Sequence, residues 1–402
     1  MPRTILILNA GSSSIKFALS DVSNPAVPRR IARGGIEGIG IAPHLSACDA
    51  DGKPVAEQRW KAGEVPDHEA VLHELLRWSE AHMEGELIAV GHRVVHGGSH
   101  FTAPVLVSEE VLEALEALTP LAPLHQPHNT SPIRAILAIR PYLPQIACFD
   151  TAFHHTQSPL VTAFALPPAF AEEGVRRYGF HGLSYECIAG RLKAEVPDLA
   201  PGRVIVAHLG NGASLCAMQD CRSVETTMGF STLDGLVMGT RCGAIDPGVL
   251  LYMMQKKGMT AKEIERLLYK ESGMLGVSGL SSDMRDLLAS DDPRAREAVA
   301  LFAFRAAREM AALTGTLGGL DGIVFTAGIG EHSPEIRAAI CDRLGWLGVV
   351  LDDAANRQGA AVVSAPESRV VVRVMETNEE LMILRHTIDL VGDTCLADAR
   401  AV

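Results

Sequence analysis

The segment from Ile5 to Leu19 constrains the fold of this chain most, because two apolar, strand-like runs flank a short polar turn, Asn-Ala-Gly-Ser-Ser-Ser. Gly11 permits a sharp reversal, the small serines leave main-chain N–H groups exposed, and Lys16 adds a charge suited to phosphoryl oxygens. Asn9, at the end of the first run, could hold a hydrated metal ion. We expect a phosphate-binding hairpin, and the alternative is an ordinary hairpin with a serine-rich turn. The Walker pattern is absent.

A second segment, Arg203 to Met218, repeats this design about half a chain later. It again reads as a strand, a turn of Asn, Gly and Ser residues, and a strand. Such self-similarity is typical of an internally duplicated fold. We therefore predict two phosphate-binding hairpins that face each other across a cleft; the alternative is a chance pairing of two hairpins.

Length and composition set the domain organisation. The chain has 402 residues, of which 47% are hydrophobic and 21% charged, enough for two compact domains of a soluble globular protein. Apolar, β-rich runs alternate with helical patterns, which indicates α/β layering. We predict an N-terminal domain of residues 1–150 plus a C-terminal helix at about 386–402, and a nucleotide-binding domain of residues 151–385.

Charge and cysteine usage exclude several classes of partner. The net charge of −12 and the absence of Lys/Arg runs argue against nucleic acid or an anionic membrane, and leave small anions held by local clusters. Eight scattered cysteines without a C-x-x-C pair, and no signal peptide, predict reduced thiols in the cytoplasm rather than disulfides or a zinc site. No apolar run is long enough to predict a membrane span.

A third glycine-rich segment, Gly322 to Glu335, reads as a buried strand, a G-x-G turn and a helix start. Ser333 suits the N-cap and Pro334 the first helical position. With the two hairpins, this segment predicts a platform for adenosine; the alternative is a plain strand-to-helix connector.

Other helices are predicted from capping and periodicity. Capping boxes occur at 260–263 and 377–380, and an apolar-faced helix runs from Glu297 to Leu313. These patterns describe the core rather than the chemistry.

Two segments place a charged residue near a predicted strand: one carries an arginine and the other a carboxylate. Arg93 lies between glycines in the segment 91–98, where a guanidinium could reach an anion from a short loop. Asp150 follows the apolar strand 145–149, at the kind of strand end where α/β sheets carry ligands. Asp150 could position an attacking oxygen or a magnesium ion. The alternatives are a surface arginine and a turn aspartate.

Three further residues complete the candidate chemistry. His181 is flanked by glycine and followed by a helix N-cap, which would hold its ring at a cleft rim; a structural histidine is the alternative. Arg241 is again embedded between glycines, and with Arg93 could clamp a phosphoryl group from two sides. Glu379 is in the first turn of the last helix. The alternative for it is a structural role, because an acidic residue there interacts favourably with the helix dipole.

On these residues the chain resembles the acetokinase family, the acetate kinases, within the sugar-kinase, actin and heat-shock-chaperone ATPase superfamily. The segments Asn9–Lys16 and Gly91–Gly98 resemble the two signature patterns of this family, and the resemblance runs end to end. It implies a duplicated ribonuclease-H-like α/β fold, a homodimer and transfer of phosphate from ATP to acetate. It also implies magnesium, for which manganese can substitute.

The resemblance also implies roles for individual residues. Asn9 and Glu379 match the metal-associated residues, Arg93 the substrate-binding arginine, and Asp150, His181 and Arg241 the catalytic residues. Further residues match the nucleotide contacts: Lys16, His208, Leu209, Gly210, Asn211, Gly212, Asp283, Met284, Arg285, Gly328, Ile329, Gly330, Glu331 and His332. The acyl pocket of the family maps to Val95, Leu124, Phe180 and Thr232.

Two positions depart from the family pattern. Thr232 stands where proline is frequent, and Ala244 stands where many relatives have aspartate. A hydroxyl in place of a ring could change the width or polarity of the acyl pocket, so a propionate or butyrate kinase of the same mechanism remains an alternative. The more distant alternative is a non-catalytic nucleotide switch, in which paired arginines and His181 would have little use.

Overall fold

The computed structural model describes residues 3–11, 13–61, 63–64, 67–82 and 85–398 of the chain. Ser12 of the first predicted turn lies outside these residues, as do residues 399–402 at the end of the predicted first domain and the side chain of Cys395.

Contacts divide the chain into two compact units, of which the first contains residues 1–152 and 378–402 and the second residues 153–377. The sequence predicts that the chain passes from one domain to the other at 150/151 and returns at 385/386. In the structure the chain returns to the first unit earlier, between residues 377 and 378. The reason is that the whole last helix, α15 (Glu379–Asp398), packs on strands β1, β6 and β8 of the first unit.

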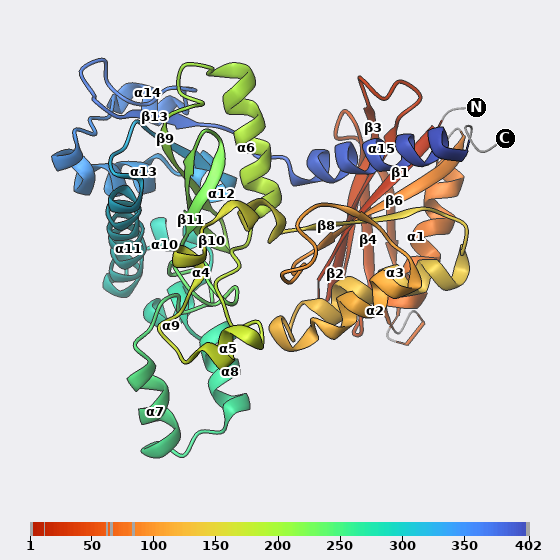
Figure 1. Cartoon of the computed structure of the whole chain (residues 1–402), viewed down its shortest axis with the longest axis horizontal. Coiled ribbons are helices and arrows are strands. Elements are labelled where there is room, and N and C mark those ends of the chain that lie inside the picture. Colours follow the sequence, from red (N-terminus) through yellow and green to blue (C-terminus); the bar gives the residue numbers. More distant parts are fainter. Residues whose placement is uncertain (1–2, 12, 62, 65–66, 83–84, 399–402) are drawn as a thin grey trace. The chain divides into compact units, whose positions relative to one another are not determined.

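The first unit is built on a mixed β-sheet with α-helices against it (Figure 1). Its strands are β1 (Arg3–Ala10), β2 (Ser14–Asp21), β3 (Arg29–Glu37), β4 (His44–Asp49), β5 (Pro54–Arg59), β6 (Glu86–Val94), β7 (Val105–Leu106) and β8 (Gln145–Phe149). Its helices before α15 are α1 (His68–His82), α2 (Glu109–Ala117), the 3₁₀ helix η1 (Thr119–Leu121) and α3 (Gln126–Ile139).

The second unit has its own mixed sheet, made of β9 (Arg203–Leu209), β10 (Ala213–Gln219), β11 (Arg222–Thr226), β12 (Gly322–Thr326) and β13 (Val371–Val374). The 3₁₀ helix η2 (Ala152–Thr156) leads into it. Its helices are α4 (Pro159–Thr162), α5 (Pro168–Glu172), α6 (Gly182–Glu195), α7 (Pro247–Gln255), α8 (Ala261–Lys270), α9 (Gly273–Ser278), α10 (Met284–Leu288), α11 (Pro293–Leu317), α12 (Ala327–His332), α13 (Pro334–Cys341), η3 (Asp342–Leu347) and α14 (Asp353–Gln358).

The two sheets share one topology, which confirms the predicted duplication. The central strands have the order β3-β2-β1-β6-β8 in the first unit and β11-β10-β9-β12-β13 in the second. In each, the first three strands are antiparallel neighbours and the last two join in parallel. The first unit adds β4 and β5 beyond β3, and β7 at the opposite edge. Both predicted hairpins are therefore confirmed, each as the first antiparallel pair of its sheet.

Apolar side chains from helices pack against the strands of each sheet. In the first unit, helix α1 contributes Val71, Leu72, Leu75 and Leu76 to a core with Leu6, Leu8, Ile15 and Phe17 of the hairpin. In the second unit, Tyr185, Ile188 and Leu192 of α6 pack on Val204, Val206 and Met218, while α11 contacts β9, β10 and β11 (Figure 1). These alternating apolar positions explain why the strand predictions held.

The predicted helices are present, with two differences at their starts. Thr260 and Glu263 form the predicted capping box of α8, and α11 extends the predicted 297–313 helix at both ends, between Asp292 and Gly318. The box predicted at 377–380 is wrong. Helix α15 begins one residue later than that box requires, and the Asn378 side chain accepts the N–H of Leu381 at 2.9 Å.

Two further findings concern the thiols and the helices of the described chain. The described cysteines, from Cys48 to Cys341, are free thiols. Within the described residues no helix has an apolar stretch that could span a bilayer.

Candidate active site

Three strand ends and one helix start gather polar side chains in the first unit. Strand β6 lies in parallel between β1 and β8, so the carboxyl ends of these strands meet at one edge of the sheet. Asn9 is near the end of β1, Arg93 near the end of β6, and Asp150 directly follows β8. Glu379 is the first residue of α15, which packs on the same strands.

Arg93 connects these groups. Its Nε and Nη2 donate to the two carboxylate oxygens of Asp150 at 2.9 and 2.6 Å, a bidentate pair. Its Nη1 donates to Oδ1 of Asn9 at 3.3 Å, and its Nε lies 3.8 Å from a carboxylate oxygen of Glu379. Arg93 is thus a strand residue held among oxygens, and the predictions of a short-loop or surface arginine are wrong.

Burial and charge act in opposite directions on Arg93. Burial lowers the pKa of its guanidinium, but the charges of Asp150 and Glu379 outweigh it and raise that pKa. The Asp150 side chain is only 2% exposed, so its negative charge depends on this compensation. The Arg93 guanidinium therefore stays protonated throughout the ordinary pH range.

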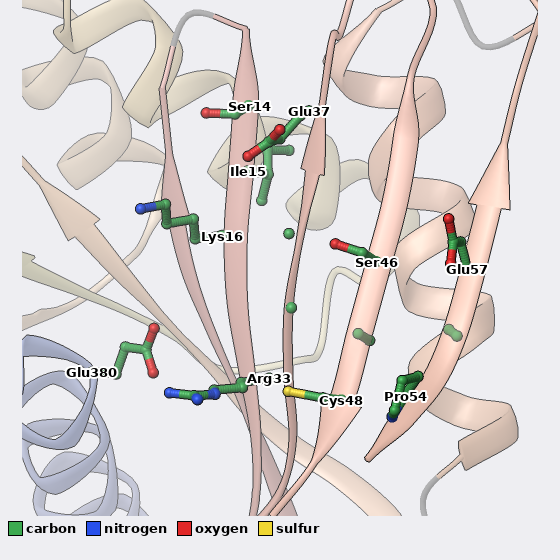
Figure 2. Close-up of a pocket in the computed structure, with 14 residues that line it drawn as sticks. Ser14, Ile15, Lys16, Arg33, Glu37, Ser46, Cys48, Pro54, Glu57 and Glu380 are labelled. Carbon is green, nitrogen blue, oxygen red and sulfur yellow. The ribbon is translucent and has the colours of Figure 1, made fainter. Parts of the chain in front are cut away.

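Lys16 lies in β2 rather than in the turn, directly opposite Asn9 of β1. Residues opposite each other in an antiparallel pair project on the same face of the sheet. On this face a pocket of about 460 Å³ opens over β2 to β5, and Lys16, Arg33 and Glu380 line one end of it (Figure 2). Burial raises the pKa of Glu380, although the charges of Arg30, Arg33 and Lys16 oppose this.

Gly11 lies in the sharp reversal predicted for it, but does not use the conformational freedom of glycine. Its N–H donates to the carbonyl of Ser14 at 2.8 Å, which closes the turn. Its φ is not positive, and a Cβ built on it would lie 3.7 Å from the nearest atoms of Ser14. The reversal therefore needs no glycine here, because the backbone stays in a region open to any residue.

In the second unit, His181 occupies the N-cap of α6 itself, with φ of 59°. The sequence places the N-cap after this residue, and that detail is wrong. A left-handed backbone costs free energy for a residue with a side chain, and such positions cluster at functional sites. His181 Nδ1 lies 2.8 Å from Oγ of Ser214, and its ring stacks on that of His208 with centroids 4.2 Å apart.

Arg241 and His181 converge on Gly212, in the turn between β9 and β10. A Cβ built on Gly212 would lie 2.7 Å from Nη2 of Arg241 and 3.2 Å from Nε2 of His181. Glycine is therefore what allows both donors to approach this turn. Nη1 of Arg241 donates to the backbone carbonyl of Thr232 at 2.6 Å, which fixes the direction of the guanidinium.

A cavity of about 540 Å³ opens beside this turn, within the second unit. It brings together three segments that the sequence analysis treated separately, and its lining residues are Gly210, Asn211, Ser282, Asp283, Met284, Arg285, Gly328, Ile329, His332 and Ser333. Ser282 and Ser333 are missing from the predicted contacts. Lys16, His208, Leu209, Gly212, Gly330 and Glu331 are predicted contacts that lie outside this lining.

Asp283 and Arg285 stiffen one wall of the cavity. Asp283 is the N-cap of α10 and accepts two hydrogen bonds from the Arg285 guanidinium, at 3.0 and 2.6 Å. These bonds, together with that from the Arg285 N–H, lower the pKa of Asp283 to about 2.

The G-x-G segment forms a helix instead of the predicted turn. Helix α12 starts directly after β12, at Ala327, whose φ is 63°. A carboxylate oxygen of Glu331 accepts the N–H groups of Ala327 at 2.7 Å and of Thr377 at 3.2 Å, which compensates the strained start. Pro334 begins α13 as predicted, with Ser333 at the N-cap position but without a side-chain cap bond.

The predicted acyl-pocket residues belong to different units. Val95 and Leu124 are in the first unit, whereas Phe180 and Thr232 are in the second. Val95 is held by its N–H, which donates to Oδ1 of Asn129 at 2.9 Å. Phe180 is fully buried.

Sequence reasoning missed the buried polar residues that support these side chains. Asn129 of α3 connects the ends of two strands, since its Nδ2 also donates to the carbonyl of Ala10 at 2.8 Å. Ser214 and Tyr185 support His181, and Ser184 supports His208 at 2.8 Å. The position of Ser214 directly after the second turn was a usable signal.

The part of the chain that the structure describes contains no cluster of three or more His, Cys, Asp or Glu side chains arranged to hold a metal ion. Oxygen donors suited to a hard cation are nevertheless present in the first unit, on Asn9 and Glu379.

Comparisons with known proteins agree with these observations. The model of the acetokinase family matches residues 4–385. An acetate kinase of Rhodopseudomonas palustris is 55% identical over 395 residues, covering 96% of this chain and 98% of that protein. An acetate kinase of Nitrobacter hamburgensis is 49% identical, covering 99% and 98% of the two chains.

Solved structures give the same result. A propionate kinase from Francisella tularensis superposes with a TM-score of 0.88 at 37% identity, covering 96% of this chain and 99% of that one. The acetate kinase of Porphyromonas gingivalis superposes with a TM-score of 0.87 at 35% identity, covering 97% and 100%. The chain therefore belongs to the acetokinase family.

Proposed function

We propose that this protein is an acetate kinase, which transfers the γ-phosphate of ATP to acetate and forms acetyl phosphate and ADP, reversibly. The observation that carries the proposal is the convergence of His181 Nε2 and Arg241 Nη2 on Gly212, next to a cavity lined by three segments that match the nucleotide contacts of the family. Family membership and relatives named acetate kinase support it further.

In this proposal the second unit binds the nucleotide. The adenosine and the phosphates would occupy the cavity lined by Asn211, Arg285 and Ile329. His181 and Arg241 would donate to the equatorial oxygens of the transferring phosphoryl group, where charge shifts during in-line transfer. Such preorganised donors suit a reaction that needs alignment and charge neutralisation more than covalent chemistry.

The first unit would bind acetate and the phosphate side of ATP. Arg93 has two further guanidinium N–H bonds beyond its three donated ones, and we propose that they hold the acetate carboxylate. A carboxylate nucleophile is already ionised near pH 7, so Asp150 need not remove a proton. Asp150 would instead fix the direction of Arg93 and orient the γ-phosphate, and Lys16 would contact phosphoryl oxygens.

We propose that Asn9 and Glu379 hold magnesium, with manganese as a substitute. Their amide and carboxylate oxygens fit a hard cation, and magnesium usually binds one or two carboxylates and retains several waters. The Glu379 side chain is 23% exposed, so a hydrated ion can reach it. When bound, the ion would supply positive charge against the phosphates.

A propionate kinase is the second candidate, and a specific observation favours keeping it. The similar structure from Francisella tularensis is a propionate kinase, and Thr232 stands where acetate kinases frequently have proline. The other departure, Ala244, affects the loop after Arg241 rather than the reaction. We expect propionate to be accepted in addition to acetate, because one methylene in an apolar pocket is worth only about 1–3 kcal/mol of discrimination.

The test is to trap acyl phosphate with hydroxylamine. Purified protein is incubated with magnesium-ATP and acetate, propionate or butyrate in parallel, and initial rates are compared. The fastest product from acetate would support the proposal. Preference for a longer acid would move the assignment to a related kinase, and no hydroxamate despite ATP binding would indicate a nucleotide switch.

We also propose a cytoplasmic homodimer. Helix α7 supports the dimer: in the described chain it buries none of its residues, and Leu251, Tyr252 and Met254 are 53%, 52% and 47% exposed. Exposed apolar surface of this kind marks interaction sites. Light scattering should report a dimer that becomes a monomer in Leu251→Asp, whereas Leu160→Asp, at a residue 88% exposed on α4, should leave the dimer intact. A monomeric parent protein would contradict the proposal.

A further inference from the structure

A chain of hydrogen bonds leads from the core of the second unit to the ring of His181. Tyr185, one turn into α6, is fully buried, and its Oη lies 2.5 Å from Oγ of Ser214 in β10. The same Oγ lies 2.8 Å from Nδ1 of His181. Ser214 is also fully buried, so solvent does not compete for either contact.

The direction of this chain follows from the tyrosine. Within the described residues, Ser214 is the hydrogen-bond partner of the Tyr185 hydroxyl. A buried O–H group without an acceptor is costly, so Tyr185 must donate to Ser214. Burial also raises the pKa of Tyr185 well above its usual value, which keeps the proton on its oxygen.

Ser214 then has one proton to give and one ring nitrogen to receive it. Its oxygen accepts from Tyr185, so its own O–H points to Nδ1 of His181. A ring nitrogen that accepts carries no proton, and in a neutral imidazole the other nitrogen then carries it. The proton of His181 is thus on Nε2, the atom that lies nearest to Gly212.

We propose that Tyr185 and Ser214 are positioning residues that hold His181 as the neutral Nε2–H tautomer, with this N–H directed at the transferring phosphoryl group. The inference rests on the function proposed above and assigns a task to two residues that the predicted site does not contain.

The surroundings of the ring favour the neutral form. Protonation of Nδ1 would reverse the Ser214 bond and leave the buried Ser214 proton without an acceptor. The ring also stacks on His208 and shares its approach to Gly212 with the Arg241 guanidinium, so a second positive charge there would meet repulsion. A neutral N–H donor beside a fixed guanidinium is the arrangement that results.

The first experiment reads the tautomer directly. In protein labelled with ¹⁵N-histidine, the side-chain nitrogen shifts of His181 should show a protonated Nε2 and an unprotonated Nδ1. Ser214→Ala and Tyr185→Phe should each convert this pattern to a mixture of tautomers. In Tyr185→Phe the apolar ring that packs on Val206 and Met218 is retained, so the fold is preserved.

Ser184→Ala provides the matched control. It removes a serine hydroxyl at the same 2.8 Å distance from Nδ1, but from the ring of His208. It should change the nitrogen shifts of His208 and leave the tautomer of His181 as it is. If the double variant Tyr185→Phe/Ser214→Ala, which leaves no orphaned hydroxyl, keeps the parental His181 tautomer, the inference is wrong.

The second experiment measures turnover. Both single variants should lower kcat on the order of 10-fold, less than the ~10²–10³-fold expected from loss of a donor itself, with the KM for ATP and acetate nearly unchanged. Equal loss in kcat and rise in KM would indicate a general packing defect and overturn the assignment. If the parent protein forms no acyl phosphate, the proposed function fails, while the nitrogen shifts still report whether the tautomer is held.

Discussion

The two halves of this molecule start from the same hairpin and use it differently. In the first unit, β1 ends at Ala10 and Gly11 has room for a side chain. In the second unit, the turn ends at Gly212, against which a guanidinium and an imidazole are packed. The topology thus repeats, but the chemistry depends on which side chains other elements bring to the strand ends.

The two regions also differ in the groups that hold their arginines. In the first unit, Arg93 is fixed by the carboxylate of Asp150 and the amide of Asn9. In the second, Nη1 of Arg241 donates to a neutral backbone carbonyl, that of Thr232. The first arginine is thus held by a carboxylate, and the second by a backbone carbonyl.

Removal of each arginine should give the largest difference between the two regions, in stability and in activity. Arg93→Ala leaves the buried Asp150 carboxylate without its bidentate partner, which should cost about 3–5 kcal/mol of stability as well as activity. Arg241→Ala should lower kcat by about 10²–10³-fold with little change in the thermal unfolding midpoint, and His181→Ala should behave likewise. Hydroxamate rates and calorimetry measure the two effects.

A lysine variant is the control for the first of these arginines. Arg93→Lys keeps the charge but loses the bidentate geometry, so it should recover stability better than activity. Near-normal turnover in Arg241→Ala would remove this residue from the mechanism.

Alanine at the two turn glycines should give the next largest difference. A Cβ at Gly212 displaces the Arg241 and His181 donors, and misplacement of such groups by about 1 Å costs roughly 10²-fold in rate. A Cβ at Gly11 meets only ordinary contacts at 3.7 Å, so Gly11→Ala should have the smaller effect on kcat. A larger loss at Gly11 would contradict our account of the second turn.

Acid should weaken the first unit more than the second. Burial lowers the pKa of His92 and His96 in the first unit, and of His154 in the second, to about 4. Between pH 6.5 and 4 the unfolded chain binds more protons at these sites, so stability falls as the pH falls. Each histidine should cost about 2 kcal/mol between pH 7 and 5.

Unfolding midpoints from pH 7 to 5 check this expectation, with probes in each unit because two domains need not unfold together. His92→Gln should flatten the pH dependence of the first unit and leave that of the second. An unchanged slope would mean that His92 is protonated in the folded protein.

The sequence was informative wherever a local pattern decides the structure. The strand Gln145–Phe149 and the Asp150 that follows it were predicted residue by residue, because an apolar run that ends at a polar residue has few other interpretations. Both hairpins and the Thr260 capping box followed from equally local signals.

The rest depended on contacts between distant segments. Nothing near Arg93 indicates that it pairs with Asp150, 57 positions away, or that Asn129 holds the strand end beside it. The left-handed backbone of His181 and Ala327 was missed because residues with a side chain rarely adopt it, and the surrounding structure maintains it. The helical G-x-G segment shows the same limit, because Glu331, which stabilises the helix start, also accepts the N–H of Thr377, 46 positions away.

Acyl selectivity should show the smallest effect and indicates which unit sets chain length. Thr232→Pro retains the carbonyl that Arg241 contacts. The resulting change in the propionate-to-acetate ratio of kcat/KM should therefore correspond to less than the ~1–3 kcal/mol that one methylene is worth. Val95→Ala removes buried apolar volume in the first unit and should raise that ratio further. If Thr232→Pro has the larger effect, the second unit sets acyl length, and the departure at this position is a determinant of specificity rather than a neutral change.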